Sequence, residues 1–205
     1  MALSCPIGFD VDGLRRQVSD TYTQVANAPD GEFHFHRGPD YAAELLGYDR
    51  AELASLPASC TASFAGVANP LAIAPIQSGD VVLDVGSGSG MDLILAARRT
   101  GETGRAIGVD PTPAMRELAA RAAREAGVGE RVTILEGDTQ SLPVDDDSVD
   151  VVISNGVLNL SPDKTEAFAE IWRILRPGGR LQLGDVVLGR DLSEKTRSDA
   201  DLWAA

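Results

Sequence analysis

The chain has 205 residues, which fits one domain of ordinary size with at most a short appendage. Its hydrophobic share of 43% and charged share of 24% are those of a folded globular protein and exclude a disordered one. The formal net charge of −13 argues against nucleic acid as a ligand, because such binding depends on Lys and Arg neutralising phosphates.

Membrane insertion and secretion are also not expected. The sequence has no apolar run of about 18 residues that could span a bilayer, and its first residues, MALSCPIGFD, lack the basic and apolar segments of a signal peptide. We therefore predict a cytoplasmic protein. Cys5 and Cys60 are too few for a disulfide framework, so each is expected to be a small or buried thiol.

The N-terminal part, residues 1–75, is predicted to be a helical and loop cap, distinct from a core formed by residues 76–205. A helix is expected from about Asp10 to Ala26. Its apolar side chains recur at intervals of three and four: Leu14, Val18, Tyr22 and Val25. Frequent Pro and Gly interrupt the stretch that follows, leaving room for short helices at Tyr41 to Leu46 and Arg50 to Leu56.

After Gly79 apolar strands alternate with amphipathic helices, which is typical of βαβ units and a parallel sheet. The predicted strands are Val81 to Val85, Ala106 to Val109, Val132 to Glu136, Val149 to Ser154 and Arg180 to Val187. The predicted helices are Met91 to Arg99, Pro113 to Ala126 and Lys164 to Leu175. Pro113 in a first turn and Gly127 just past a helix end agree with capping preferences. The acidic run at 145–147 is interpreted as a solvated loop.

A glycine-rich turn joins the first of these strands to its helix in the segment VVLDVGSGSGMDLILAARR. After Asp84, the glycines Gly86, Gly88 and Gly90 permit a sharp turn and a close approach of ligand to backbone, next to free N–H groups at the helix start. The following strand ends in Asp110, twenty residues past Gly90. A carboxylate at that place can accept hydrogen bonds from both hydroxyls of a ribose.

Two classes of cofactor compete for such a turn. Dinucleotide enzymes use G-x-G-x-x-G, in which a pyrophosphate rests on the helix N-terminus, whereas the spacing here is G-x-G-x-G followed by Met91. The helix opens with Asp92, an anion that would repel a phosphate but suits a cationic methionine group. We therefore predict S-adenosylmethionine as the cofactor, with a dinucleotide oxidoreductase as a less favoured alternative.

At these residues, and from Gly79 to Val187 generally, the chain resembles the class I methyltransferases, which have a Rossmann-like α/β sheet with helices on both faces. The resemblance implies the strand order 3-2-1-4-5. Strands six and seven are expected to be absent, because only residues 188–205 follow the fifth predicted strand, and those read as a turn and a helix from about 193 to 203. The resemblance also places two sets of cofactor contacts in this chain. The first is Pro111 and Thr112 after Asp110, and the second is Asp138 and Thr139 in EGDTQSLP. Asp138 would meet the adenine amino group, although its plain interpretation is a turn residue. The segment Arg176 to Gly179 matches the family's P-G-G hairpin.

Several further segments are similar to the arsenite methyltransferase group: FAGVANP, GETGRAIGVDPTPAM and LPVDDDSVDVVISNGVLNLSPDK. This similarity places Asn155 and Asn159 at the end of the fourth strand, near the methyl acceptor, with Asn155 among the cofactor contacts. The group binds arsenite through cysteine thiolates, but the aligned positions hold Gly156 and either Val67 or its neighbour Gly66. Cys60 could contribute one sulfur, which makes a poor three-thiolate site for a metalloid.

Other candidate ligands and bases are few. His34 and His36 flank Phe35 and would point to one face of an extended segment, but no third ligand is evident and no metal site is predicted. Tyr22 and Phe64 are candidates to close over the cofactor, with ordinary core packing as the alternative. No residue is compelled as a general base, so the catalytic residues are left unassigned.

The sequence thus predicts an S-adenosylmethionine-dependent methyltransferase that acts on a small-molecule acceptor other than arsenite. The alternative is a catalytically inactive cofactor-binding protein or sensor. With its outer strands absent, the fifth strand would leave an apolar edge that must be covered, either by the N-terminal segment or by a second subunit in a homodimer.

Overall fold

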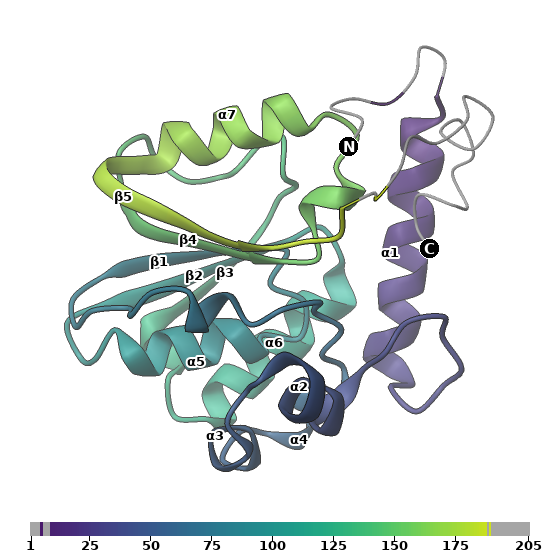
Figure 1. The fold of residues 1–205 in the computed structure, drawn as a ribbon, viewed down its shortest axis with the longest axis horizontal. Helices are drawn as coiled ribbons and strands as arrows, with labels where there is room; N and C mark the ends of the chain where they lie inside the picture. Colours follow the sequence, from purple (N-terminus) through teal and green to yellow (C-terminus); the bar gives the residue numbers. More distant parts are fainter. Residues whose placement is uncertain (1–4, 6–8, 188, 190–205) are drawn as a thin grey trace.

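The computed structural model describes residues 5, 9–187 and 189, and it contains one five-stranded parallel sheet in the order β3-β2-β1-β4-β5 (Figure 1). Its strands are β1 Val81–Val85, β2 Arg105–Asp110, β3 Val132–Glu136, β4 Val149–Asn155 and β5 Leu175–Gly184. The predicted α/β class and strand order are therefore confirmed.

Helices cover both faces of the sheet, as predicted. On one face lie α5 (Met91–Arg99) and α6 (Pro113–Glu125), and on the other lies α7 (Lys164–Ile174) (Figure 1). Alternate residues of β1 serve the two sides, because Val82 joins the apolar core under α5 and α6 while Leu83 and Val85 join the core under α7. Both faces of the central strands are therefore buried.

The N-terminal part is helical and lies against the core. Its helices are α1 (Val11–Asn27), α2 (Gly38–Leu46), α3 (Arg50–Ala54) and α4 (Ala58–Ala62), the last of which the sequence did not predict. Three short 3₁₀ turns complete the helical elements: η1 Pro70–Ala72, η2 Gly129–Arg131 and η3 Leu158–Leu160. Helix α1 packs against α6 and runs past the carboxyl ends of the strands (Figure 1). It begins at an N-cap formed by Asp10, whose Oδ1 accepts a hydrogen bond from Gly13 N–H at 2.7 Å.

The last strand differs from its prediction at both ends. Leu175 already pairs with Val149, and after a register shift Arg180 pairs with Val151, so the predicted Pro-Gly-Gly hairpin is an irregularity within β5. Gly178 there has a φ of 86°, which favours glycine. The strand ends at Gly184 and does not reach Val187. Beyond it, the Asp185 carboxylate accepts hydrogen bonds from the N–H groups of Asn159 and Val186.

The outer edge of β5 is unpaired in the part of the chain that the structure describes. No strand follows β5 within residues 5, 9–187 and 189, and the predicted helix at 193–203 lies outside them. Among the described N-terminal residues, α1 packs against α6, and η1 packs against β4 and β5, where Gln182 Nε2 donates to the Pro70 carbonyl at 2.8 Å. Exposed apolar side chains occur on α7 and just after β5: Phe168, Trp172, Val186 and Val187. Across the same described residues, no helix combines the length and apolar character needed to cross a membrane.

Candidate functional site

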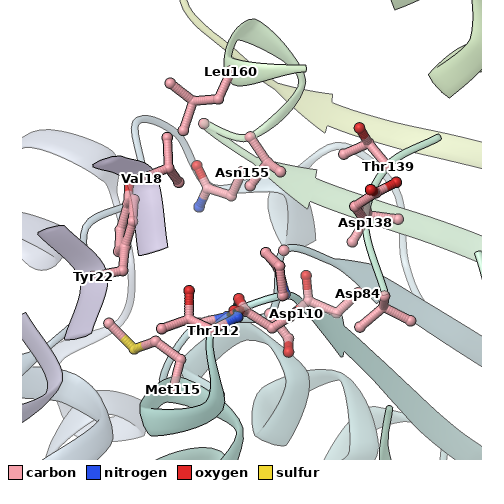
Figure 2. A pocket seen from close by; sticks show the side chains of 18 of the residues that line it. Val18, Tyr22, Asp84, Asp110, Thr112, Met115, Asp138, Thr139, Asn155 and Leu160 are labelled. Atoms are coloured by element: carbon pink, nitrogen blue, oxygen red, sulfur yellow. Dashed lines mark hydrogen bonds between the residues drawn. The ribbon is translucent and has the colours of Figure 1, made fainter. Parts of the chain in front are cut away.

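A cavity of about 210 Å³ lies at the carboxyl ends of β1, β2 and β4, between the sheet and α1 (Figure 2). Nine of the ten predicted cofactor-binding residues line it: Asp84, Gly86, Gly88, Asp110, Pro111, Thr112, Asp138, Thr139 and Asn155. The exception is Gly90. A cavity at this edge of an open parallel sheet is the usual position of a ligand site.

The three glycines of the turn have different structural roles. At Gly86, with φ 71°, an added Cβ would lie 2.4 Å from a methyl of Val157, so only glycine fits there. Gly88, with φ 50°, faces open space in the cavity. Gly90 is the N-cap of α5, and a Cβ there would approach the Cβ of Ala119 in α6 to 3.0 Å. Gly86 and Gly88 therefore shape the cavity, while Gly90 allows two helices to pack closely.

Asp110 ties the end of β2 to the glycine turn. Its Oδ2 accepts a hydrogen bond from Gly88 N–H and its Oδ1 one from Thr112 N–H, both at 2.8 Å. The side chain is buried, and burial raises the pKa of Asp110 against the opposing effect of these bonds. Each carboxylate oxygen keeps a further lone pair for a ligand hydroxyl.

Two more buried carboxylates, Asp84 at the end of β1 and Asp92 in the first turn of α5, line the same cavity. Asp92 accepts hydrogen bonds from the Tyr48 hydroxyl at 2.7 Å and from Asn155 Nδ2 at 2.9 Å. Burial raises the pKa of Asp92 to about 6. Asp84 keeps one oxygen, Oδ2, buried without a hydrogen-bond partner, and burial together with the charges of Asp92 and Asp110 raises its pKa well above the usual range. An arrangement of this kind favours a cationic ligand, which would relieve the repulsion.

Asn155, at the end of β4, is committed to holding the loop at 66–68. Its Oδ1 accepts from Val67 N–H at 2.8 Å and from Ala68 N–H at 3.0 Å, while its Nδ2 donates to the Ala68 carbonyl and to Asp92. A Cβ at Gly66 would lie 2.3 Å from this nitrogen, so the loop approaches too closely for any other residue. Asn155 lines the cavity, but its amide already has partners on both sides.

Gly156 and Val67 are neighbours in space, because a Cβ at Gly156 would lie 3.2 Å from a methyl of Val67, and neither residue carries sulfur. Cys60 is fully buried, its Sγ faces the Pro57 carbonyl, and burial raises the pKa of its thiol to about 12. Cys5 donates a backbone hydrogen bond to Pro162, and neither thiol is among the residues that line the cavity.

Helix α1 supplies a wall that the sequence did not predict as part of the site. Leu14, Arg15, Val18 and Tyr22 all line the cavity, because residues four apart share one face of a helix. Arg15 donates to the Asp138 carboxylate at 3.0 Å across the mouth of the cavity. The periodic stripe was visible in the sequence, but it was interpreted as packing surface, with Tyr22 alone expected near the cofactor.

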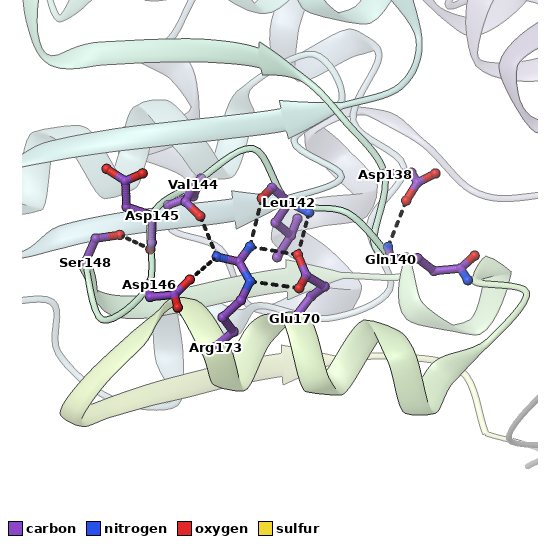
Figure 3. Close-up of polar contacts among 9 residues, drawn as sticks. All are labelled: Asp138, Gln140, Leu142, Val144, Asp145, Asp146, Ser148, Glu170 and Arg173. Carbon is purple, nitrogen blue, oxygen red and sulfur yellow. Dashed lines mark hydrogen bonds and ion pairs between the residues drawn. The ribbon is translucent and has the colours of Figure 1, made fainter.

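The loop that carries Asp138 and Gln140 is anchored on α7 (Figure 3). Arg173 donates to the carbonyls of Leu142 and Val144, and it forms ion pairs with Glu170 and Asp146, each at 2.7 Å. The acidic run 145–147 is exposed as predicted, and Asp146 from this run forms the ion pair with Arg173. Asp138 itself accepts from the Gln140 N–H at 2.8 Å, the turn geometry of its plain interpretation.

The two histidines lie away from the cavity. His34 and His36 are exposed, with ring contacts to Phe35 and Tyr41 at 4.9 and 5.2 Å between centroids. Among the described residues, no group of three or more His, Cys, Asp or Glu is placed to hold a metal ion.

Comparison with known proteins agrees with the fold. Residues 76–205 match the family model described as a methyltransferase domain, so the chain belongs to the methyltransferase-domain family. Membership of this family implies S-adenosylmethionine as the cofactor.

Within that class the chain is similar to arsenite methyltransferases. It is 42% identical to that of Halobacterium salinarum over 159 residues, which are 78% of this chain and 40% of that protein. It is 34% identical to that of Homo sapiens over 130 residues, which are 60% of this chain and 35% of that protein. The chain thus spans about two fifths of the length of these curated relatives. An arsenic(III) S-adenosylmethionine methyltransferase structure from Chlamydomonas reinhardtii superimposes with a TM-score of 0.67 at 40% identity, covering 75% of this chain and 53% of that one.

Proposed function

We propose that this protein transfers a methyl group from S-adenosylmethionine to a small-molecule acceptor other than arsenite. The observation that carries the proposal is the acidic wall of the cavity, in which Asp84, Asp92 and Asp110 are all buried and one oxygen of Asp84 has no partner. Such a wall suits a ligand that carries both an ammonium and a sulfonium cation.

The residues of the cavity fit the parts of that cofactor. Asp110 has lone pairs for the two ribose hydroxyls, and Asp138 with Thr139 stands where the adenine amino group is expected. Asp84 and Asp92 are placed to pair with the cationic groups of the methionine moiety. Gly86 and Gly88 leave room for the amino-acid end of that moiety. Pro111, Thr112 and Asn155 complete the set as residues that shape the wall. These assignments are proposals.

The cofactor, when bound, supplies an electrophilic methyl group on sulfur. The protein's part is to hold the acceptor's nucleophile about 3 Å from that carbon, in line with the leaving sulfur, and to keep water away. Helix α1 closes the cavity on one side and the Arg15–Asp138 ion pair spans its mouth. Positioning of this kind can supply most of the rate enhancement of a displacement that needs no acid or base from the protein.

We infer that arsenite is not the acceptor from the positions at which the family resemblance places the thiolates. Those positions hold Gly156 and either Val67 or Gly66, and Cys60 is fully buried outside the cavity lining. A soft metalloid needs several thiolates converging on one point. The acceptor therefore differs from the one in the names of the curated relatives.

A rival proposal is a cofactor-binding protein without turnover. The observation that favours it is that the carboxylates of the described lining are engaged with protein partners or, for Asp84, are assigned to the cofactor, so none of them is left to bind an acceptor. Turnover of S-adenosylmethionine with a pool of extracted metabolites, followed by mass spectrometry of methylated products, separates the two. A methylated product supports the enzyme, and cofactor binding without any product supports the sensor.

The class of cofactor is tested by thermal unfolding. We expect S-adenosylhomocysteine to raise the melting temperature by several degrees at concentrations about a hundredfold above its dissociation constant, and NADH to leave it unchanged. A shift with NADH alone would overturn the proposal. A cytoplasmic location, a homodimer through the β5 edge and the absence of nucleic-acid ligands stay predictions from the sequence.

A further inference from the structure

Among the charged and titratable side chains that line the described cavity, acidic groups outnumber basic ones. They are Arg15, Tyr22, Asp84, Asp92, Asp110 and Asp138. The single guanidinium among them is already paired with the Asp138 carboxylate at 3.0 Å. A carboxylate or phosphate on the acceptor would therefore find no unpaired cationic side chain in the described lining. These contacts favour an uncharged acceptor.

The carboxylates of the lining already have protein partners or an assigned role. Asp110 accepts from two backbone N–H groups, and Asp92 accepts from Tyr48 and Asn155. The open oxygen of Asp84 is assigned to the cofactor cation in the proposed function. The remaining group, Tyr22, is neutral at physiological pH, because burial and the charge of Asp110 raise its pKa to about 12. An acceptor that ionises without a base from the described lining fits these contacts best.

Part of the cavity lining is apolar. It is built by Leu14, Val18 and Tyr22 of α1, by Phe64, and by Val157 and Leu160 after β4. In Figure 2, Val18 and Tyr22 of α1 and Leu160 of η3 face the cavity, across from Asp110 and Asp84. We call these six residues the apolar wall. It suits an uncharged hydrocarbon or aromatic body.

Resting on the proposed function, we propose that the acceptor is an uncharged, apolar thiol held against the apolar wall. Thiols are the nucleophiles that least need a base, because a few per cent is already thiolate near pH 7 and sulfur is strongly nucleophilic. The S–H bond ionises with its proton passing to water, a new S–CH₃ bond forms, and the bond between methyl and sulfonium breaks. The products are a methyl thioether, S-adenosylhomocysteine and one proton.

Three matched probes test the chemistry: 2-phenylethanethiol, 2-phenylethanol and 4-(2-mercaptoethyl)benzoate. We expect the methyl thioether to form from the first, no ether from the alcohol, which has the same shape but no thiol, and at least about a tenfold lower kcat/KM for the carboxylated thiol. Equal turnover of the carboxylated thiol, or methylation of the alcohol, would overturn the proposal. So would the absence of thioether from 2-phenylethanethiol in protein that binds S-adenosylhomocysteine.

A binding measurement tests the apolar wall without turnover. Calorimetry of 2-phenylethanethiol into the complex with S-adenosylhomocysteine should show binding that Leu160→Arg weakens about tenfold, while affinity for S-adenosylhomocysteine stays within about twofold. Val18→Asn is the second variant, in case the first does not fold. Leu45→Arg is the matched control, because Leu45 is 69% exposed on α2 and does not line the cavity. An unchanged thiol affinity in both wall variants would refute the assignment of the wall.

The pH profile tests the missing base. Without a protein base, log kcat/KM should rise with pH and level off at the pKa of the thiol itself, so thiophenol should level off well below 2-phenylethanethiol. A common inflection for both thiols would reveal a protein base and overturn the proposal. These outcomes are distinct from failure of the proposed function, in which neither S-adenosylmethionine nor S-adenosylhomocysteine would bind at all.

Discussion

The charge of Asp92 gives the sharpest test of how the cavity distinguishes a cationic cofactor from its neutral product. The Asp92→Asn substitution removes one buried negative charge and keeps the shape of the side chain. Its new amide can still accept from Asn155 through oxygen, and the Tyr48 hydroxyl retains the Ala68 carbonyl at 3.1 Å as an acceptor. The fold should therefore survive the change.

The magnitude follows from the pKa. Burial raises the pKa of Asp92 from 3.8 to about 6, which corresponds to about 3 kcal/mol of unfavourable free energy for the ionised carboxylate. A sulfonium nearby recovers part of that free energy, while the thioether of S-adenosylhomocysteine recovers none of it. If about half is recovered, the substitution lowers the affinity for S-adenosylmethionine about tenfold relative to that for S-adenosylhomocysteine.

The sign of the pH dependence follows from the same shift. A carboxyl whose folded pKa lies above its unfolded pKa binds its proton more tightly in the folded protein, so without ligand the stability of the protein falls as pH rises from about 4 to 6. This decline should be smaller in Asp92→Asn. Affinity for the cationic cofactor changes in the opposite direction, rising from pH 5 to 7 as Asp92 ionises.

The assay is calorimetry with both ligands at pH 5, 6 and 7, with urea unfolding at the same pH values. Asp145→Asn is the control, because it removes the same charge from an exposed loop outside the cavity lining. The reasoning fails if the ratio of the two affinities, and its change with pH, are the same in Asp92→Asn as in the unaltered protein.

Four further outcomes are expected. Asp110→Ala removes charge-assisted bonds to the ribose, each worth about 1.5 to 3 kcal/mol, so calorimetry should show at least a tenfold loss of S-adenosylhomocysteine affinity. Arg15→Ala breaks a half-exposed ion pair worth about 0.5 kcal/mol, so stopped-flow should show S-adenosylhomocysteine dissociating about twofold faster, with Arg16→Ala unchanged. No methylated arsenicals should form above background with glutathione present, and their appearance at a Cys60-dependent rate would contradict the site. The β5 edge should be covered, either by the N-terminal segment or by a second subunit, and a well-behaved monomer in light scattering together with rapid amide exchange along Leu181 to Val187 would refute that coverage.

The core could be predicted from the sequence because its signals are local. The bounds of β1, β3 and α5 match their predicted ranges, since each couples a clear apolar pattern to a glycine or a capping residue. The proximity of Asp84 and Asp110 was also predictable, because the carboxyl ends of neighbouring parallel strands lie at the same edge of the sheet. Errors gathered at β5, where the Pro-Gly-Gly segment looked like a turn but joins the sheet through an irregular pairing with β4.

The rest of the site depends on contacts between distant parts of the chain. Asn155 lies about ninety positions from the loop that its amide holds, and Arg15 lies even further from Asp138. Neither contact produces a local pattern in the sequence. From the sequence, Asn155 was therefore predicted as a ligand contact, and no role was predicted for Arg15. The α1 stripe had a signal, but a helical apolar face that lines a cavity has the same periodicity as one that packs on a core.

Different parts of the chain therefore form the two ends of the cavity. The carboxylates that suit the cofactor lie at the carboxyl ends of β1 and β2 or in the first turn of α5, and Asp110 is also held by backbone hydrogen bonds. The apolar wall comes largely from α1, Phe64 and the turn at η3, none of which supplies a hydrogen bond within the sheet. Substitutions in that wall can change the acceptor while the cofactor site stays intact, because a rigid scaffold and its surrounding segments vary independently.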